Sequence, residues 1–388
     1  MSSQAFSSNI LRLEHSATLA VASKVRSRRE KGLRVIDLGL GEPMFRTPAS
    51  VNAAAVQAIS DGHTHYTAVE GLSSLRAAIA KDTERVSGRG VKPEQIVVTT
   101  GSKQALFNAC FVLFGEGDDV LIPTPAWPTY SQMVTLARAE PVAVRGDSSN
   151  DWKVSADILA SAATNRTRGL VLNSPCNPTG AVYSPAELEE IVRLAAERGW
   201  WVIFDEIYRD LIYDAEPGSI MGLNVSNSKT IVIGGVAKNF AMTGWRIGWA
   251  IGPEDVVGAM TAVQSNTTSN ACTISQYAAL EALTSQDAAA ERRVMLSVLR
   301  ARRQMALELL DSVDAEFSHP GGAFYLFFRV GNNTIGSSEA FASRLLDEHG
   351  VVVVPGSAFG AEGWIRASYA GLEEDLAVGL NAIASCLR

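Results

Sequence analysis

The sequence contains few residues that could hold a metal or a disulfide framework. Its 388 residues include only four cysteines, which are far apart and form no Cys-x-x-Cys pair. They are Cys110, Cys176, Cys272 and Cys386. Free thiols in a reducing compartment are therefore expected. The one close pair of histidines, His63 and His65, lies in a loop-like stretch that favours surface residues over ligands, so no metal site is predicted.

Long apolar runs and basic blocks are also missing. No stretch has the length needed to cross a membrane, and residues 1–12 have no apolar run like that of a signal sequence. The 34 basic residues are outnumbered by 41 acidic ones, which gives a net charge of −7. We therefore expect a cytoplasmic protein that binds neither membranes nor nucleic acids.

The chain does contain an alternation of short apolar strands and amphipathic helices. Its length exceeds that of one compact core, and 47% of its residues are hydrophobic, which is ample for a globular enzyme. The strand-like runs are residues 96–100, 120–123, 142–144, 169–172, 200–204, 230–233 and 248–251. This alternation predicts an α/β fold with a mostly parallel sheet covered by helices on both faces.

The pattern changes after about Gln286. A long helical stretch, residues 288–310, is followed by short strands and helices up to the end of the chain. This order indicates a smaller α+β domain, and we expect the N-terminal helix to pack with it, so that this domain is discontinuous. The predicted domains are residues 47–286 for the large one, and residues 1–46 with 287–388 for the small one.

Lys238 is the first candidate for chemistry. It lies on the connection between two strand-like runs, in the stretch Gly235-Val-Ala-Lys-Asn-Phe-Ala-Met-Thr-Gly-Trp-Arg-Ile-Gly248. Apolar neighbours disfavour the ammonium form, and a depressed pKa is what a lysine that forms a Schiff base needs. A lysine at the edge of the core that extends its amine to water is the alternative.

Asp205 and Asn177 follow two other buried strands, at the edge of the sheet where α/β proteins bind ligands. A buried aspartate is costly unless a cation or a strong donor meets it, and a protonated pyridine nitrogen would do so. A salt bridge to Arg209 is the alternative. Asn177 belongs to an Asn-Pro-Thr-Gly turn, and its amide could also face a ligand oxygen.

Two further stretches follow predicted strands. In Thr100-Gly-Ser-Lys-Gln-Ala105 a strand runs directly into a helix, whose free N–H groups and dipole favour a phosphate. A plain N-cap by Ser102 explains the same pattern. Trp127 offers a flat face on which a planar heterocycle could stack, although a tryptophan buried for packing is the more common case.

These motifs together carry a family resemblance that covers nearly the whole chain. They are Gly41-Glu-Pro43, Tyr66, Gly101-Ser-Lys103, Trp127, Asn177-Pro-Thr-Gly180, Asp205-Glu-Ile-Tyr208, Lys238 with Met242-Thr-Gly-Trp-Arg246, and Arg366. The set resembles the class I/II aminotransferases of fold type I, which use pyridoxal 5′-phosphate. The resemblance implies an aminotransferase with the Schiff base on Lys238.

The resemblance also implies a role for each residue. Lys238 would bind the cofactor and move a proton, Asp205 would hold the pyridine nitrogen, and Asn177 and Tyr208 would contact its phenolic oxygen. Trp127 would stack on the ring, and Gly101, Ser102, Lys103 and Arg246 would bind the phosphate. Tyr66 resembles a tyrosine that reaches the phosphate from a neighbouring subunit, which implies a homodimer with shared active sites. Arg366 and the Gly41 backbone would hold the substrate carboxylate, beside Trp127 and Asn177.

Departures from the common pattern point to a subgroup. Many relatives carry serines at the positions of Gly235 and Ala237, whereas the Gly-x-Ala-Lys form resembles the bacterial aspartate aminotransferases. In that subgroup Ser16, Thr18 and Lys103 would bind the distal carboxylate of the substrate. Glu14 stands near a position where the use of prephenate is associated with lysine, and so argues against that substrate.

The resemblance therefore implies transfer of the amino group of aspartate or glutamate to a 2-oxo acid such as 2-oxoglutarate. Residues 265–270 lack an arginine that other aspartate aminotransferases use, so the preference for dicarboxylates depends mainly on Lys103. Three alternatives stay open. They are transamination of aromatic or alanine-type substrates, a carbon–sulfur lyase on the same fold, and a cofactor-binding sensor. Such sensors are fused to a DNA-binding domain, for which this sequence leaves no room before about residue 14.

Overall fold

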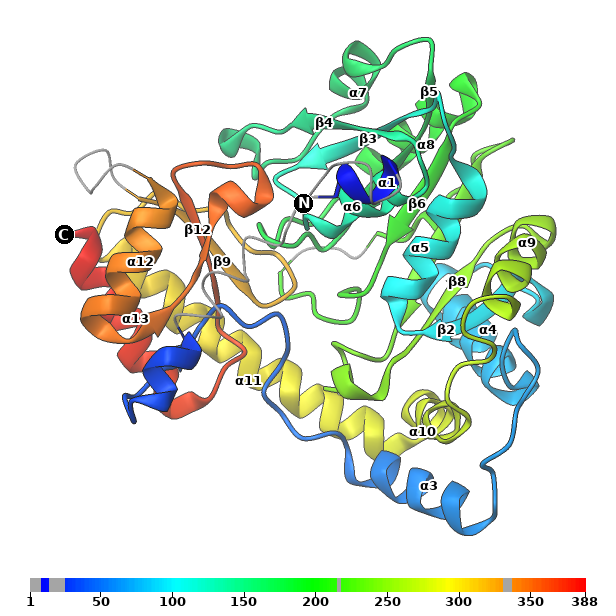
Figure 1. The fold of residues 1–388 in the computed structure, drawn as a ribbon, viewed down its shortest axis with the longest axis horizontal. Helices are drawn as coiled ribbons and strands as arrows, with labels where there is room; N and C mark the ends of the chain where they lie inside the picture. The colour runs from blue at the N-terminus through cyan, green and yellow to red at the C-terminus, as the bar shows by residue number, and fades with distance from the viewer. Residues whose placement is uncertain (1–7, 14–24, 215–217, 331–336) are drawn as a thin grey trace.

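The computed structural model describes residues 8–13, 25–214, 218–330 and 337–388. A large α/β unit and a smaller unit lie side by side, joined beneath by the long helix α11, Gln286–Asp311 (Figure 1). None of the helices in these residue ranges combines the length and the apolar character needed to span a bilayer. We propose a domain boundary near the start of α11.

A seven-stranded sheet forms the centre of the large unit, with the strand order β2-β8-β7-β6-β5-β3-β4. The strands are β2 (Ile96–Thr100), β3 (Asp119–Thr124), β4 (Glu140–Arg145), β5 (Thr167–Asn173), β6 (Trp201–Asp205), β7 (Lys229–Gly235) and β8 (Ile247–Ile251). Strand β8 is antiparallel to both of its neighbours, and the other pairs are parallel. All strands except β8 therefore point the same way, which confirms the predicted, mostly parallel sheet.

Helices cover both faces of this sheet. On one face lie α5 (Ser102–Leu113), α6 (Thr129–Leu136) and α9 (Glu254–Ser265). On the other lie α3 (Ala49–Ser60), α4 (Ser73–Ser87), α7 (Ala156–Ala162), α8 (Pro185–Arg198) and α10 (Thr273–Thr284). Helix α8 shows how the sequence sets these elements: Ser184 and Glu187 form a capping box, and Gly199 ends the helix at a φ of 69°.

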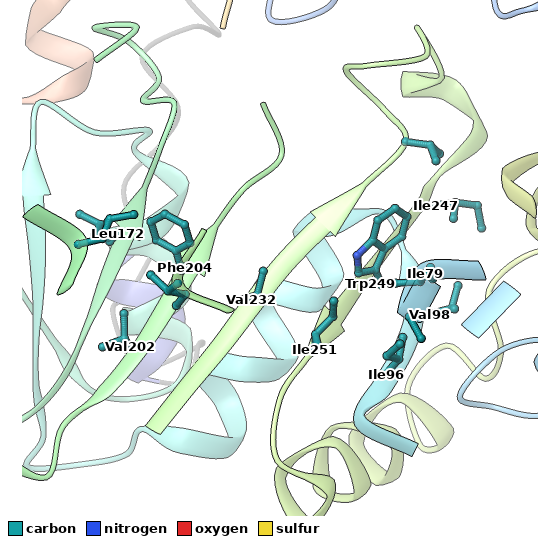
Figure 2. Close-up of a cluster of buried hydrophobic side chains, with 14 of the residues drawn as sticks. Ile79, Ile96, Val98, Leu172, Val202, Phe204, Val232, Ile247, Trp249 and Ile251 are labelled. Carbon is teal, nitrogen blue, oxygen red and sulfur yellow. The ribbon is translucent and has the colours of Figure 1, made fainter. Parts of the chain in front are cut away.

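Side chains that alternate along each strand fill two cores. Figure 2 shows Val202, Phe204 and Val232 together on one face of the sheet. Ile203 and Ile231, which come next to them in sequence, belong to the core on the opposite face. A strand buried on both faces is therefore apolar at nearly every position, and this is the signal that made these strands predictable.

The small unit contains the other described strands, helical residues 25–30 and two helices near the C-terminus. Its strands are β1 (Ile36–Asp37), β9 (Tyr325–Arg329), β10 (Val351–Val352), β11 (Val354–Pro355) and β12 (Trp364–Ser368), and its helices are α12 (Ser338–His349) and α13 (Glu373–Leu387). Strand β1 pairs in parallel with β10, although more than 300 residues separate them in sequence. Residues near the N-terminus thus complete the small unit.

The described residues before β1 contact both units. Helix α1, Ser8–Leu11, packs against α6 of the large unit, and Arg12 donates a hydrogen bond to Glu140 in β4. By contrast, Arg34 pairs with Asp375 of α13 at 2.7 Å. Residues 8–13 thus lie against the large unit, and the segment around Arg34 lies against the small one.

The core beside β6 is expected to carry much of the stability of the large unit. Phe204 is fully buried in the cluster of Figure 2, so Phe204→Ala should lower the free energy of unfolding by about 3–5 kcal/mol. The matched control is Val294→Ala, because this side chain is 64% exposed on α11 and should change stability by less than about 0.5 kcal/mol. Urea denaturation of both variants measures the difference. Equal midpoints would contradict this packing.

Candidate active site

A cavity of about 530 Å³ lies between the carboxyl edge of the large sheet and the small unit. It is lined by residues from both units. From the large unit come Ser102, Lys103, Leu106, Trp127, Pro128, Thr129, Tyr130, Asn177, Asp205, Ile207, Tyr208, Ala237, Lys238, Thr243 and Arg246. From the smaller unit and the segment after β1 come Gly39, Gly41, Tyr325, Val354, Ala358, Phe359 and Arg366.

The direction of the strands explains why these residues meet. Asp205 is the last residue of β6, and Lys238 lies on the turn after β7. Ser102 follows β2, which runs the same way. Arg246 directly precedes β8, and since β8 is reversed, its amino end lies at the same edge. One antiparallel strand thus brings a cation to the edge where the other strands end.

Asp205 is buried and has no ion pair in the described part of the chain. One of its carboxylate oxygens accepts a hydrogen bond from the Tyr130 hydroxyl at 2.7 Å, and the other accepts one from the Ile207 N–H at 3.0 Å. Burial raises the pKa of Asp205 to about 6, against the lowering effects of these bonds and of Lys238. The alternative of a salt bridge to Arg209 is not seen, because Arg209 pairs with Asp82.

Lys238 is half-buried, and its amine donates a hydrogen bond to the Gly41 carbonyl. Burial lowers the pKa of Lys238 to about 8. The charge of Arg366 also lowers it, whereas Glu42 and Asp205 act in the opposite direction. An appreciable part of this amine is therefore uncharged near neutral pH, as a nucleophile must be.

The start of α5 forms a site suited to an anion. Its N-cap, Gly101, has a φ of 76°, and no side chain caps the helix. A Cβ at Gly101 would lie 2.5 Å from Arg246 Nη2, so glycine allows the guanidinium to lie against the helix start. The Gly101 N–H donates to the Thr99 carbonyl at 2.8 Å, whereas the N–H groups of Ser102 and Lys103 have no hydrogen-bond partner among the described residues.

The Ser102 side chain is not an N-cap. Its hydroxyl donates to the Gly234 carbonyl at 2.8 Å, which joins α5 to strand β7. A Cβ at Gly235 would lie 2.6 Å from this hydroxyl oxygen. A serine at position 235 would therefore require the Ser102 side chain to move.

Trp127 faces the cavity rather than being enclosed in the core, since it is half-buried. The Lys103 amine lies 4.8 Å from the centroid of the Trp127 ring. Burial and the charge of Arg246 lower the pKa of Lys103. The ring of Tyr130 meets Trp127 edge-on, at 5.4 Å between centroids, and so holds the indole in place.

Arg366 joins the two units at the opposite side of the cavity. It is buried, and it donates to Asn177 Oδ1 at 3.0 Å and to the Gly39 carbonyl at 2.7 Å. Its buried Nε–H has no partner among the described residues. A buried donor without a partner is costly, and the carboxylate of a ligand would satisfy it. Gly41, whose backbone is predicted beside this carboxylate, also lines the cavity, and its carbonyl accepts a hydrogen bond from Lys238.

Tyr208 is also buried in the cavity wall, and its hydroxyl lies 2.8 Å from that of Tyr325. Neither Tyr325 nor Tyr130 was predicted as a site residue. Tyr130 could have been predicted from the sequence, because it lies one helical turn after Trp127, which follows the end of β3. Tyr325 is at the start of β9 in the other unit, and its place depends on how the two units meet.

The structure places Tyr66 away from this cavity. Tyr66 is 88% exposed and lines a separate cavity of about 410 Å³, together with His63 and Tyr277. Ser16 and Thr18 lie outside the described residues.

Comparisons with known proteins agree on one family. Residues 34–383 match the family described as aminotransferase class I and II. The chain is 42% identical to the aspartate aminotransferase of Streptomyces avermitilis, over 97% of this chain and 94% of that protein. It is 40% identical to the aspartate/prephenate aminotransferase of Thermus thermophilus, over 97% of each. The solved structure of the Thermus thermophilus aspartate aminotransferase with maleate superposes with a TM-score of 0.94, at 39% identity, over 98% of this chain and 99% of that one.

Titration of Lys238 in the protein without any ligand tests the electrostatics of this cavity. Labelling with fluorodinitrobenzene at increasing pH, followed by peptide mapping, should give a midpoint of about 8 for Lys238. An ordinary lysine titrates near ~10.4. Asp205→Asn should lower the midpoint further, because it removes a negative charge that favours the ammonium. A midpoint in the ordinary range, or a rise in Asp205→Asn, would contradict this description.

Proposed function

This chain belongs to the family of class I and II aminotransferases, and we propose that it transfers amino groups with pyridoxal 5′-phosphate bound in the cavity described above. One observation carries the proposal. Asp205, a buried carboxylate that forms no ion pair with the residues the structure describes, lies in the same cavity as Lys238, an amine with a depressed pKa. Such a pair suits a cofactor that has an aldehyde and a basic ring nitrogen.

The residues present fit this cofactor. Its phosphate suits the N–H groups at Ser102 and Lys103 together with Arg246. Trp127 offers a ring face for stacking, and Asn177 and Tyr208 offer polar groups to its phenolic oxygen. When bound, the cofactor supplies an electron sink for the bonds at the substrate's Cα.

Lys238 and Asp205 would each act on a different proton. Lys238 would bind the cofactor covalently and, once released from it, move the proton at the substrate's Cα as a general base and acid. Asp205 would hold the proton on the ring nitrogen. The hydrogen bond from Tyr130 keeps the Asp205 carboxylate oriented toward its partner. The two residues that would hold these protons thus lie on the turn after β7 and at the end of β6.

Arg366 would bind the α-carboxylate of the substrate, since its Nε–H is free and its other donors hold it in place. For the side chain we propose a second carboxylate, bound by Lys103, with Ser16 and Thr18 contributing. The relatives named aspartate aminotransferase support this assignment, and so does the Thermus structure with maleate, a short dicarboxylate. Aspartate or glutamate as donor and 2-oxoglutarate as acceptor are the proposed substrates, in a cytoplasmic enzyme.

We further propose a homodimer in which Tyr66 of each copy reaches the phosphate site of the other. Tyr66 is almost fully exposed and lines no part of its own chain's cavity. An aromatic residue this exposed, next to the stacked rings of His63 and Tyr277, suits a contact with a second copy.

The choice of donor tests the proposed substrates. Aspartate and glutamate, mixed separately with holoenzyme, should change the cofactor's absorbance faster than alanine or phenylalanine does. Lys103→Ala should lower kcat/KM for aspartate by about 10-fold or more and leave that for alanine nearly unchanged, because a charge-assisted hydrogen bond contributes about 1.5–3 kcal/mol. The control is Lys81→Ala, an exposed lysine on α4. Preference for alanine or aromatic donors, or release of ammonia and pyruvate, would contradict the assignment.

Mixing two defective variants tests the shared site. Lys238→Ala and Tyr66→Ala should each lose most turnover as homodimers. In a hybrid dimer one site carries both defects and the other carries neither, so unfolding and refolding the two together should restore activity. Recovery should be absent when either variant is refolded alone. A monomer in sedimentation, or no recovery in the mixture, would exclude the shared site.

A further inference from the structure

Two hydroxyl groups in the cavity wall connect the large unit to the small one. Tyr208 follows β6, Tyr325 begins β9, and their oxygens lie 2.8 Å apart. Both side chains are buried, with exposures of 4% and 0%. Their rings meet edge-on at 5.9 Å between centroids, so packing holds the two hydroxyl groups together.

Arg366 lies on the other side of Tyr325. Its guanidinium carbon is 4.5 Å from the centroid of the Tyr325 ring and 5.0 Å from that of Phe359. A cation over a phenol ring stabilises negative charge on the phenol oxygen, and so makes the hydroxyl a stronger donor. Accordingly, the charge of Arg366 lowers the pKa of Tyr325, although burial raises it overall.

A count of protons sets the direction of the bond between the tyrosines. Each hydroxyl carries one hydrogen and can donate only once. If Tyr208 donates to the phenolic oxygen of the cofactor, as the proposed function requires, then Tyr325 must donate to Tyr208. The donor strength of Tyr208 then depends on Tyr325, because hydrogen bonds in a chain polarise one another.

We propose that Tyr325 is a positioning residue that couples the charge of Arg366 to the hydrogen bond that Tyr208 donates to the cofactor. With Arg366 unpaired, its charge strengthens the chain of donors, and the phenolic oxygen is stabilised as an anion. A carboxylate bound to Arg366 offsets this charge and weakens the chain. Binding of the substrate thereby raises the proton affinity of the cofactor's linkage to Lys238. The inference rests on the proposed function.

Other charged and titratable groups face the same tyrosines and must be separated from this effect. Asp205 and Tyr130 face Tyr208 from the large unit, and Arg366 faces it from the small one. Arg366 also donates directly to Asn177, which gives a second route to the cofactor that avoids both tyrosines. A cycle of single and double variants distinguishes the two routes.

The experiment measures the absorbance of the cofactor–Lys238 linkage against pH, with and without maleate. Tyr325→Phe keeps the ring beneath Arg366 and removes only the hydroxyl. It should raise the midpoint without maleate by about half a unit, roughly a threefold change in proton affinity. The further rise on adding maleate should be smaller than in the unaltered protein. In a Tyr208→Phe background, Tyr325→Phe should have no additional effect.

Tyr369→Phe is the matched control. This tyrosine is buried in the same core, and its hydroxyl bonds to the Ala323 carbonyl at 3.3 Å, away from the cavity. The absorbance midpoint of Tyr369→Phe should equal that of the unaltered protein. An unmoved midpoint in Tyr325→Phe, or the same shift with Tyr208 already replaced, would overturn the coupling alone. Absence of any absorbance band that depends on Lys238 would overturn the proposed function as well.

Discussion

The burial of Asp205 without an ion pair to any described residue is the constraint on which the site depends. A carboxylate taken out of water loses its hydration, and two hydrogen bonds replace only part of that loss. Its pKa of about 6 expresses the remaining cost. A protein gains nothing in stability from such a group. The cost is offset if a ligand brings a positive charge to this point, and the rest of the cavity is built to hold such a ligand.

The fold delivers the other groups to the same place. Parallel strands end at the same edge of the large sheet, so the segments that follow β2, β5, β6 and β7 meet there. The reversed strand β8 begins at this edge and adds Arg246. Four cationic side chains, Lys103, Lys238, Arg246 and Arg366, surround the cavity against one buried acid. Anions such as a phosphate and a carboxylate are favoured in a field of that sign.

Much of this could be predicted from the sequence, because the site lies where strands end. Apolar runs locate the strands, and a polar residue directly after such a run must lie at the carboxyl edge of the sheet, where α/β proteins bind ligands. Lys238 and Asp205 were predictable for this reason. Tyr325 was not, since its contact with Tyr208 exists only once β9 of the small unit lies against the large one. The sequence likewise could not predict that the Gly101 N–H is already bonded, because its hydrogen bond to the Thr99 carbonyl leaves no pattern in the sequence.

The central claim is that the amine of Lys238 forms the covalent link to the cofactor. Reduction of the holoenzyme with borohydride would fix this link permanently, and peptide mapping by mass spectrometry would locate the pyridoxyl group. The account predicts a single labelled peptide with the group on Lys238, and no labelling of Lys238→Ala under the same conditions. A label on Lys103 or any other lysine, or no label at all, would contradict it.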